Sequence, residues 1–188
     1  MTEDDVYDLL QAYLVKIDQE AFLLNSAWPQ LTNVIRSHQD GPRPEGPYGM
    51  IQILSVRDLG AAQCLKHEEE TIDNESRIIE TRGRAVGWLI RIHIFAHYQT
   101  EHLRLFRNAL DSEHSNIELY PLIIREVKEI TPAPELIQGA FEGRGHMDTV
   151  MIGCMETRHL IDVIERGKII IAGNGGAVVH TTLDYEKP

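Results

Sequence analysis

The strongest strand pattern in the sequence is Arg84–Tyr98, RAVGWLIRIHIFAHY. Its residues alternate between two faces for fifteen positions, which is the period of a β-strand. One face holds the apolar set Val86, Trp88, Ile90, Ile92, Ile94, Ala96 and Tyr98. The other face holds Gly87, Leu89, Arg91, His93, Phe95 and His97. We therefore expect a long strand with one buried face at the centre of a sheet.

Four further segments are typical of strands that would complete this sheet. Tyr48–Arg57 is apolar on both faces except for two polar residues, which predicts a central strand. We also expect strands at Ile123–Ile130, His146–Met155 and Lys168–Ala172.

Two segments show the three- and four-residue spacing of amphipathic helices. The first runs from Val6 to Leu24, with Thr2 as the predicted N-cap and acidic residues in its first turn. The second follows Thr100, the predicted N-cap, and continues to about Ser112. We expect both helices to flank the sheet.

The polar segments between these elements predict a loop, an arm and a tail. Asp40–Pro47 contains three prolines and two glycines in eight residues, so it is a loop. Gln63–Arg82 reads as a long hairpin arm with its tip at Asp73–Ser76. Residues 173–188 begin with Gly-Asn-Gly-Gly and are predicted to be a tail that needs a partner to be ordered.

The order of elements predicts an α+β fold, a mostly antiparallel sheet with two flanking helices and a long hairpin arm. A chain of 188 residues with 43% apolar and 25% charged residues has the composition of an ordinary globular domain. We expect one domain over residues 1–172, followed by the tail at 173–188.

The charge balance bears on possible partners. The formal net charge is −11, with 18 basic and 29 acidic residues, which argues against a DNA-coating protein. The general explanation for such a charge is solubility. Arginine outnumbers lysine by 13 to 5, which suits carboxylate pairing across subunit interfaces as well as a solvated surface.

Cysteine usage and the N-terminus indicate the compartment. A single bridge between Cys64 and Cys154 is possible but unneeded in a chain of this size, so we expect two buried free thiols made in a reducing cytoplasm. The acidic N-terminus does not resemble a signal peptide, and no stretch of 18 apolar residues would span a membrane.

No motif indicates catalysis. His93, His97 and His102 invite a metal-site interpretation, but their spacing fits no compact zinc pattern. The glycines of Gly143–Asp148 and Gly173–Gly176 lack the order of a dinucleotide-binding loop and are better explained by turns. We expect no enzyme activity, no cofactor and no metal.

Two stretches carry a family resemblance. Asp40–Val56, DGPRPEGPYGMIQILSV, resembles the proline-rich loop and strand of phage neck terminator, or tail terminator-like, proteins. Phe141-Glu-Gly-Arg144, followed by the strand at His146–Met155, is similar to the turn before a strand in that family. The segment Val163–Ile171 resembles the family's last strand, so the resemblance runs from the first helix to about Ala172.

The resemblance implies a structural virion protein that forms a ring, commonly of six subunits, at the junction of neck and tail. Such a ring caps the tail tube and joins it to the head-tail connector or stopper protein, with the sheath protein as a further candidate partner. Genomic DNA would pass through the lumen without specific binding. Six copies would carry −66 formal charges, six times −11, and an acidic lumen repels phosphate.

Under this interpretation the loop, the arm tip and the turn before the strand lie at contacts between subunits or between rings. The predicted interface residues are Asp40, Pro42, Arg43, Pro44, Pro47, Asp73, Asn74, Glu75 and Arg144. Two alternatives stay open at this stage. One is another ring-forming virion component, such as a connector or baseplate protein, and the other is a small histidine-dependent metalloenzyme.

Overall fold

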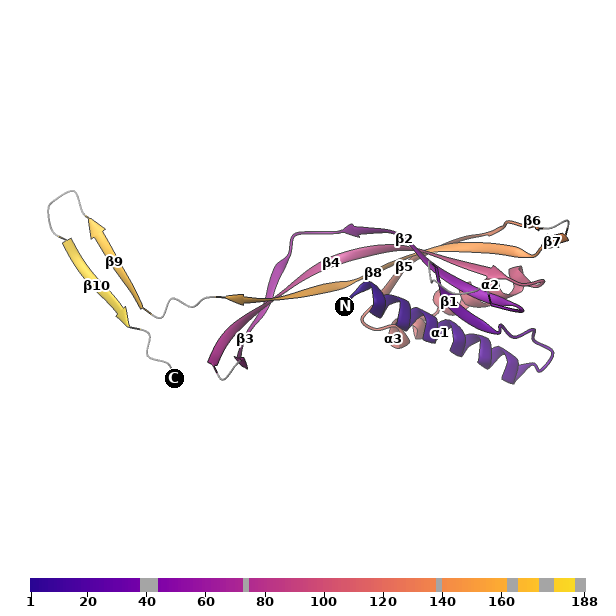
Figure 1. Ribbon diagram of the computed structural model, residues 1–188, viewed down its shortest axis with the longest axis horizontal. Coiled ribbons are helices and arrows are strands. Elements are labelled where there is room, and N and C mark those ends of the chain that lie inside the picture. The colour runs from indigo at the N-terminus through magenta and orange to yellow at the C-terminus, as the bar shows by residue number, and fades with distance from the viewer. Residues whose placement is uncertain (38–43, 73–74, 138–139, 162–165, 173–177, 185–188) are drawn as a thin grey trace. The chain divides into compact units, whose positions relative to one another are not determined.

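A computed structural model of the chain describes residues 1–37, 44–72, 75–137, 140–161, 166–172 and 178–184 (Figure 1). The chain divides into two compact units. Unit 1 consists of Met1–Gln63 and Gly83–Glu156, and unit 2 consists of Cys64–Arg82 and Thr157–Pro188. Each unit is considered by itself below, and the predicted domain boundary at residue 172 stays a prediction.

A sheet forms the framework of unit 1, with strand order β1-β2-β4-β8-β5. The strands are β1 (Asn33–Arg36), β2 (Tyr48–Asp58), β4 (Glu75–Phe95), β5 (Ile123–Pro132) and β8 (Arg144–Ile161). β2 runs antiparallel to β4 and β5 runs antiparallel to β8, while the short β1 is parallel to β2. The predicted α+β fold with a mostly antiparallel sheet is confirmed.

The predicted long strand is part of a still longer one. β4 begins at Glu75, so the second side of the arm and the alternating segment Arg84–Phe95 form one continuous strand. β4 ends at Phe95, so Ala96, His97 and Tyr98 lie beyond the strand. Two short strands of unit 1, β6 (Glu135–Ile137) and β7 (Ala140–Glu142), pair with each other.

Three helices accompany the sheet: α1 (Glu3–Leu24), α2 (Gln99–Leu110) and α3 (Glu113–Glu118). Thr2 caps α1 as predicted, because its hydroxyl accepts from the Asp5 amide while the Asp5 carboxylate accepts from the Thr2 amide. These hydrogen bonds hold the pKa of Asp5 below its usual value. The prediction of Thr100 as the second cap is wrong, since the N-cap of α2 is Tyr98, two residues earlier, and no side-chain hydrogen bond caps the helix.

The short helix α3 is not predicted by the sequence. Its six residues are too few to show a helical period, and it is held by the side chain of Ser115. The buried Ser115 hydroxyl lies 2.8 Å from the carbonyl oxygen of Leu110 and 2.7 Å from that of Ser112, and it ties α3 to the end of α2.

The core lies between the helices and one face of the sheet (Figure 1). The even-numbered face of β4 from Val86 to Ile94 is fully buried, as the alternation predicts. Its main partners on the helices are Leu10, Leu14, Leu103, Phe106 and Leu110. These side chains remove a continuous apolar layer from water, which is the main source of stability for a domain of this kind.

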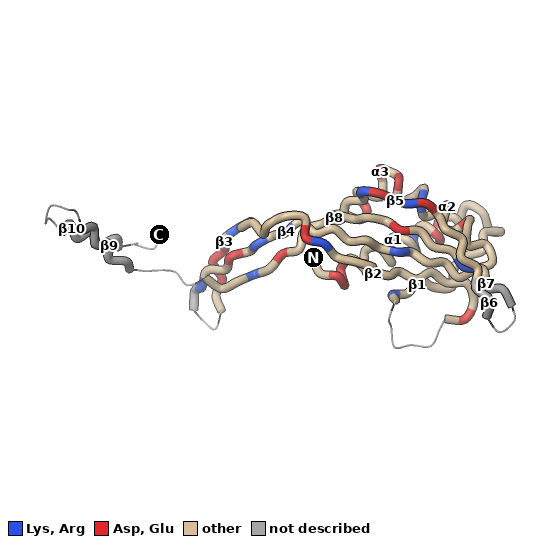
Figure 2. The backbone as a smooth tube through the Cα atoms, turned by 90° about the horizontal axis from the view of Figure 1, so that it is seen from above, with Lys and Arg blue, Asp and Glu red and all other residues tan. Residues whose placement is uncertain are grey.

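Unit 2 contains the arm that the sequence predicts. β3 (Gln63–Ile72) pairs with β4, and the tip residues 73–74 lie outside the described part of the chain. The arm carries both acidic and basic residues, including the run Glu68–Glu70 on β3 (Figure 2). β9 (Arg166–Ala172) and β10 (Val178–Asp184) form an antiparallel pair, so a strand lies within the segment predicted to be a tail.

The cysteine prediction is half right. Both Cys64 and Cys154 are free thiols, as predicted, but neither is fully buried. Cys64 is exposed on the edge strand β3, and Cys154 is half-buried. In the described part of the chain, no helix is long and apolar enough to cross a membrane.

Candidate interaction surface

The three helices pack on one side of the sheet in unit 1, and no described helix covers the other side (Figure 1). We call this second side the open face. Strand register sets its composition, because Tyr48, Met50 and Gln52 of β2 pair with Phe95, His93 and Arg91 of β4. Arg144, His146 and Asp148 of β8 lie against the same β4 residues. The open face is therefore made of aromatic, histidine and charged side chains.

One end of the open face is built on aromatic rings. Tyr48 and Phe95 stack with ring centroids 4.6 Å apart and planes inclined by 10°. The guanidinium carbon of Arg144 lies 4.9 Å from the centre of the Phe95 ring, which is a cation–π distance. Arg144, a predicted interface residue, is therefore held in place by a strand that lies far away in sequence.

An ion pair occupies the next positions. Arg91 donates to both carboxylate oxygens of Asp148, with Nε–Oδ1 at 2.6 Å and Nη2–Oδ2 at 3.0 Å. This forked geometry is the strong form of an arginine–carboxylate contact. It holds the pKa of Asp148 below its usual value, so the carboxylate stays charged near neutral pH.

His93 lies at the centre of the open face and is only 4% exposed. Its Nε2 is 3.3 Å from Oε1 of Gln52, and its ring is 5.7 Å from that of His146. Burial, with smaller contributions from Arg144, His146 and Arg91, lowers the pKa of His93 to about 4. The imidazole is therefore neutral at physiological pH, and its buried Nδ1 has no hydrogen-bond partner among the described residues.

The structure separates the three histidines that invited a metal-site interpretation. His93 lies on the open face, whereas His97 is exposed in the turn after β4. His102 is fully buried on α2, with its ring nitrogens 2.9 Å from the Tyr98 carbonyl oxygen and 2.8 Å from that of Pro29. Its contacts tie α2 to the loop after α1, so His102 has a structural role.

The remaining predicted interface residues divide by position. Asp40, Pro42, Arg43, Asp73 and Asn74 lie outside the described residues. Pro44 and Pro47 are half-buried in the segment leading into β2, and Glu75 is the first residue of β4. Their interface role stays a prediction, and the structure does not bring them into the cluster around Arg144.

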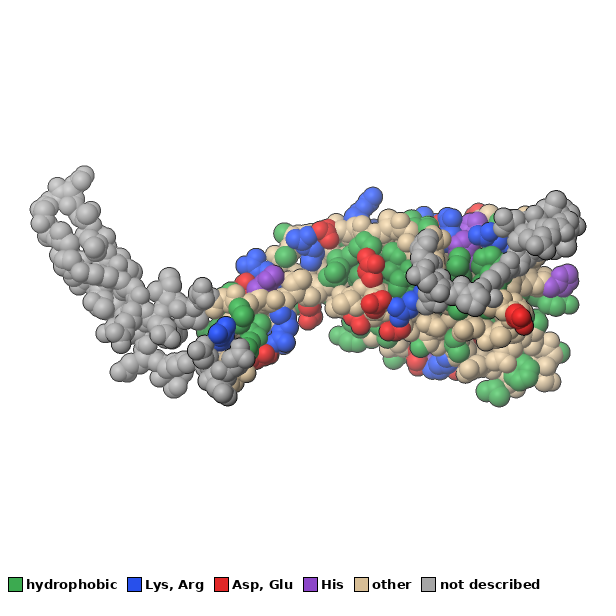
Figure 3. All heavy atoms as spheres, viewed as in Figure 1, with side chains coloured by type: hydrophobic (Ala, Val, Ile, Leu, Met, Phe, Trp, Pro, Cys, Tyr) green, Lys and Arg blue, Asp and Glu red, His purple; other side chains and the backbone are tan. Residues whose placement is uncertain are grey.

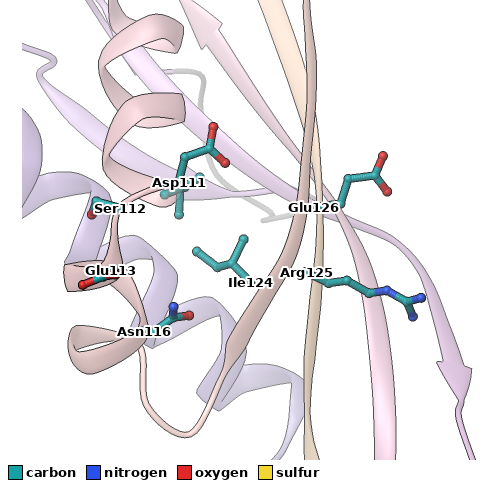
Figure 4. Close-up of a pocket in the computed structure, with 8 residues that line it drawn as sticks. Asp111, Ser112, Glu113, Asn116, Ile124, Arg125 and Glu126 are labelled. Carbon is teal, nitrogen blue, oxygen red and sulfur yellow. The ribbon is translucent and has the colours of Figure 1, made fainter.

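Two hollows lie on the surface of unit 1. The first has a volume of about 160 Å³ and is lined mainly by polar residues at the α2–α3 connection and on β5 (Figure 4). Ile124 points toward the connection, while Arg125 points away from it (Figure 4). The second, of about 510 Å³, lies between α2 and β5 and is lined mostly by polar and charged side chains such as Arg104, Arg107 and Glu129. The mainly polar lining of the first hollow differs from the largely apolar lining of a typical small-molecule site.

Sequence reasoning missed the grouping on the open face. Alternation assigns His93 and Arg91 to one face of β4, but only the register across β2 and β8 brings Tyr48, Arg144 and Asp148 beside them. No local signal in the sequence gives that register.

The chain belongs to the phage neck terminator protein family, whose model matches residues 4–175. A search of curated proteins finds no match. The protein is therefore a structural component of the phage neck, as the resemblance of Asp40–Val56 and Phe141–Arg144 indicates.

Proposed function

We propose that the protein forms a closed ring, of six subunits, that caps the tail tube and joins it to the head-tail connector or stopper protein. The observation that carries this proposal is the family match over residues 4–175. Sheath protein is a further candidate partner. The chain would be made in the host cytoplasm and act without catalysis.

Exposed apolar side chains on unit 1 support ring formation. At the end of α1, Leu23 and Leu24 are 80% and 90% exposed, next to Phe22 (Figure 3). At the α3–β5 connection, Ile117 and Tyr120 are 73% and 77% exposed, followed by Ile123. Apolar groups clustered on a surface mark protein contacts.

The two apolar clusters suit a ring because they are different from each other. Neighbours in a ring meet head to tail, so each subunit must offer two distinct surfaces. We infer that the α1 cluster, Phe22 to Leu24, and the α3 cluster, Ile117 to Ile123, lie at such contacts.

The charge suits a channel through which DNA moves. Six copies carry −66 formal charges, six times −11, and these repel phosphate. We therefore expect no tight, salt-sensitive DNA binding at physiological ionic strength.

Native mass spectrometry and electron microscopy with purified tail tubes test the proposal. The wild-type chain should form one closed oligomer that sits on tube ends. The double variant Leu23→Ser/Leu24→Ser should remain monomeric, whereas Glu3→Gln, at the exposed start of α1, should assemble normally. A wild-type chain that stays monomeric and never associates with tubes or connectors would refute the proposal.

The Asp40–Pro47 loop is tested separately. Replacing Pro42-Arg43-Pro44 by Gly-Ser-Gly should impair assembly more than it changes the free energy of unfolding of the monomer. Unchanged assembly would show that the loop only connects β1 to β2.

A further inference from the structure

Three side chains of different chemistry meet on the arm in unit 2. They are Cys64 and His67 of β3 and Glu80 of β4. One thiol sulfur, one imidazole nitrogen and one carboxylate oxygen lie within 4.8 Å of one another. Among the described residues, this is the group of three whose ligand atoms converge in this way.

Two of the three distances within this group match those between neighbouring ligands of a zinc ion, and the third, between the Cys64 thiol and the Glu80 carboxylate, is at most 4.8 Å. Cys64 Sγ is 3.6 Å from His67 Nε2, and His67 Nε2 is 3.6 Å from Glu80 Oε1. Tetrahedral zinc, with Zn–S near 2.3 Å and Zn–N near 2.0–2.1 Å, places neighbouring ligand atoms about 3.4–3.6 Å apart. A metal ion could therefore enter with little movement of these side chains.

The donor set also selects the metal. Thiolate and imidazole are ligands for zinc and other late transition metals, whereas magnesium and calcium prefer oxygen alone. Three protein ligands leave one position of a tetrahedron for water. Cys64 and His67 are exposed, so an ion can reach them from solvent.

Arg82 fixes the carboxylate of this group. Its Nε donates to Glu80 Oε2 at 2.8 Å, and the contact of Nη2 with Oε1 is longer, at 3.3 Å. Oε1 is the oxygen nearer to His67. Metal-binding carboxylates are commonly oriented by such a partner.

We propose that Cys64, His67 and Glu80 bind one zinc ion per chain and that the ion links edge strand β3 to β4. Binding releases the thiol proton of Cys64 to solvent, and the thiolate joins neutral His67 and ionised Glu80 around the ion. The proposal does not depend on ring formation. No sequence pattern indicates this site, because residues 64 and 67 would lie on opposite faces of a regular strand and Glu80 comes from another strand.

The test is a cobalt(II) titration of the full reduced chain, made without an affinity tag. Cobalt(II) reports thiolate binding through a sulfur-to-metal charge-transfer band and reports tetrahedral geometry through intense visible bands. We expect both at one equivalent, and we expect zinc to displace the cobalt, since zinc binds more tightly to such ligands.

Variants assign the ligands. Cys64→Ser should abolish the charge-transfer band, and the matched control Cys154→Ser should retain it. Loss of a residue that only orients a ligand typically weakens metal binding by about 10- to 100-fold. His67→Ala and Glu80→Ala should weaken binding by more than this, and Arg82→Ala should weaken it by about 10-fold. Circular dichroism should show unchanged folding, because the replaced side chains are not in the core.

The outcomes decide the proposal directly. No charge-transfer band in the wild-type chain overturns it. A band that persists in Cys64→Ser overturns it too, as does a band that depends on Cys154. Competition with a chromophoric chelator measures zinc binding independently. A zinc stoichiometry near zero in the wild-type chain would also overturn the proposal.

Discussion

The two faces of β4 within unit 1 have the same backbone but different roles. Its even-numbered face, from Val86 to Ile94, is wholly apolar and fully buried under the helices. Its odd-numbered face carries Arg91, His93 and Phe95, whose polar and aromatic contacts run to β2 and β8. The even-numbered face supplies hydrophobic stability, while the open face is held by specific ring, hydrogen-bond and ion-pair contacts.

This difference shows how a one-sided sheet supports a structural role. The helices anchor the strand, so the open face does not need to be apolar for the unit to fold. Four measurements test this distinction between the faces.

The largest effect is expected on the buried face. Ile90→Ala removes a side chain with no exposure and should reduce the free energy of unfolding by about 2–5 kcal/mol. Leu89→Ala, on the neighbouring open-face position, is the matched control and should cost about 1 kcal/mol or less, because Leu89 is only half-buried. Chemical denaturation of both variants measures this, and equal losses would remove the distinction.

A second effect concerns Gly143, which precedes β8 and its open-face residues. A Cβ at this position would clash with the carbonyl oxygen of Ala96, while the Gly143 carbonyl accepts from the Ala96 amide at 3.0 Å. Gly143→Ala should therefore cost about 1–3 kcal/mol in denaturation. Gly60→Ala is the control, since a Cβ there meets nothing within 4 Å, and a comparable loss in that variant would contradict the steric explanation.

The third prediction uses the depressed pKa of His93, about 4 in the folded chain. Between pH 6.5 and 5 the unfolded chain protonates this histidine and the folded chain does not, so stability should fall as pH falls, by up to about 1.4 kcal/mol per pH unit. His93→Gln should flatten this slope. Denaturation of both chains at several pH values checks the difference, and identical slopes in the wild-type chain and the variant would refute the neutral buried imidazole.

The smallest effect is expected for the Arg91–Asp148 pair, whose side chains are 32% and 18% exposed. A double-mutant cycle with Arg91→Met and Asp148→Asn should give a coupling energy of about 1 kcal/mol, weakened by added salt. A coupling of several kcal/mol would mean that the open face supports folding as strongly as the buried face does.

Local patterns allowed much of the fold to be predicted. Alternation identified β4, spacing identified α1 and α2, and the Thr2 cap followed from an acidic first turn. The second cap was misplaced because Tyr98 starts α2 without a side-chain hydrogen bond, so the residue type gave no warning. Helix α3 was missed because six residues carry no period.

The candidate sites could be predicted only in part. Arg144 was singled out through the family resemblance, but its place over Phe95 depends on how β8 lies beside β4. His93 and His97 share parity, yet the strand ends between them, which separates their environments. Cys64, His67 and Glu80 share no local pattern, and only the pairing of β3 with β4 brings them together.

The α+β class, the buried face of β4, the arm and the resemblance to the neck terminator family could all be inferred from the sequence. These depend on residue period, composition and motif, which are local or can be compared along the chain. The tertiary structure alone decided which side chains meet on the open face and on the arm. Strand register is set by the packing of the whole sheet, so contacts between residues as distant as Arg91 and Asp148 appear only after folding.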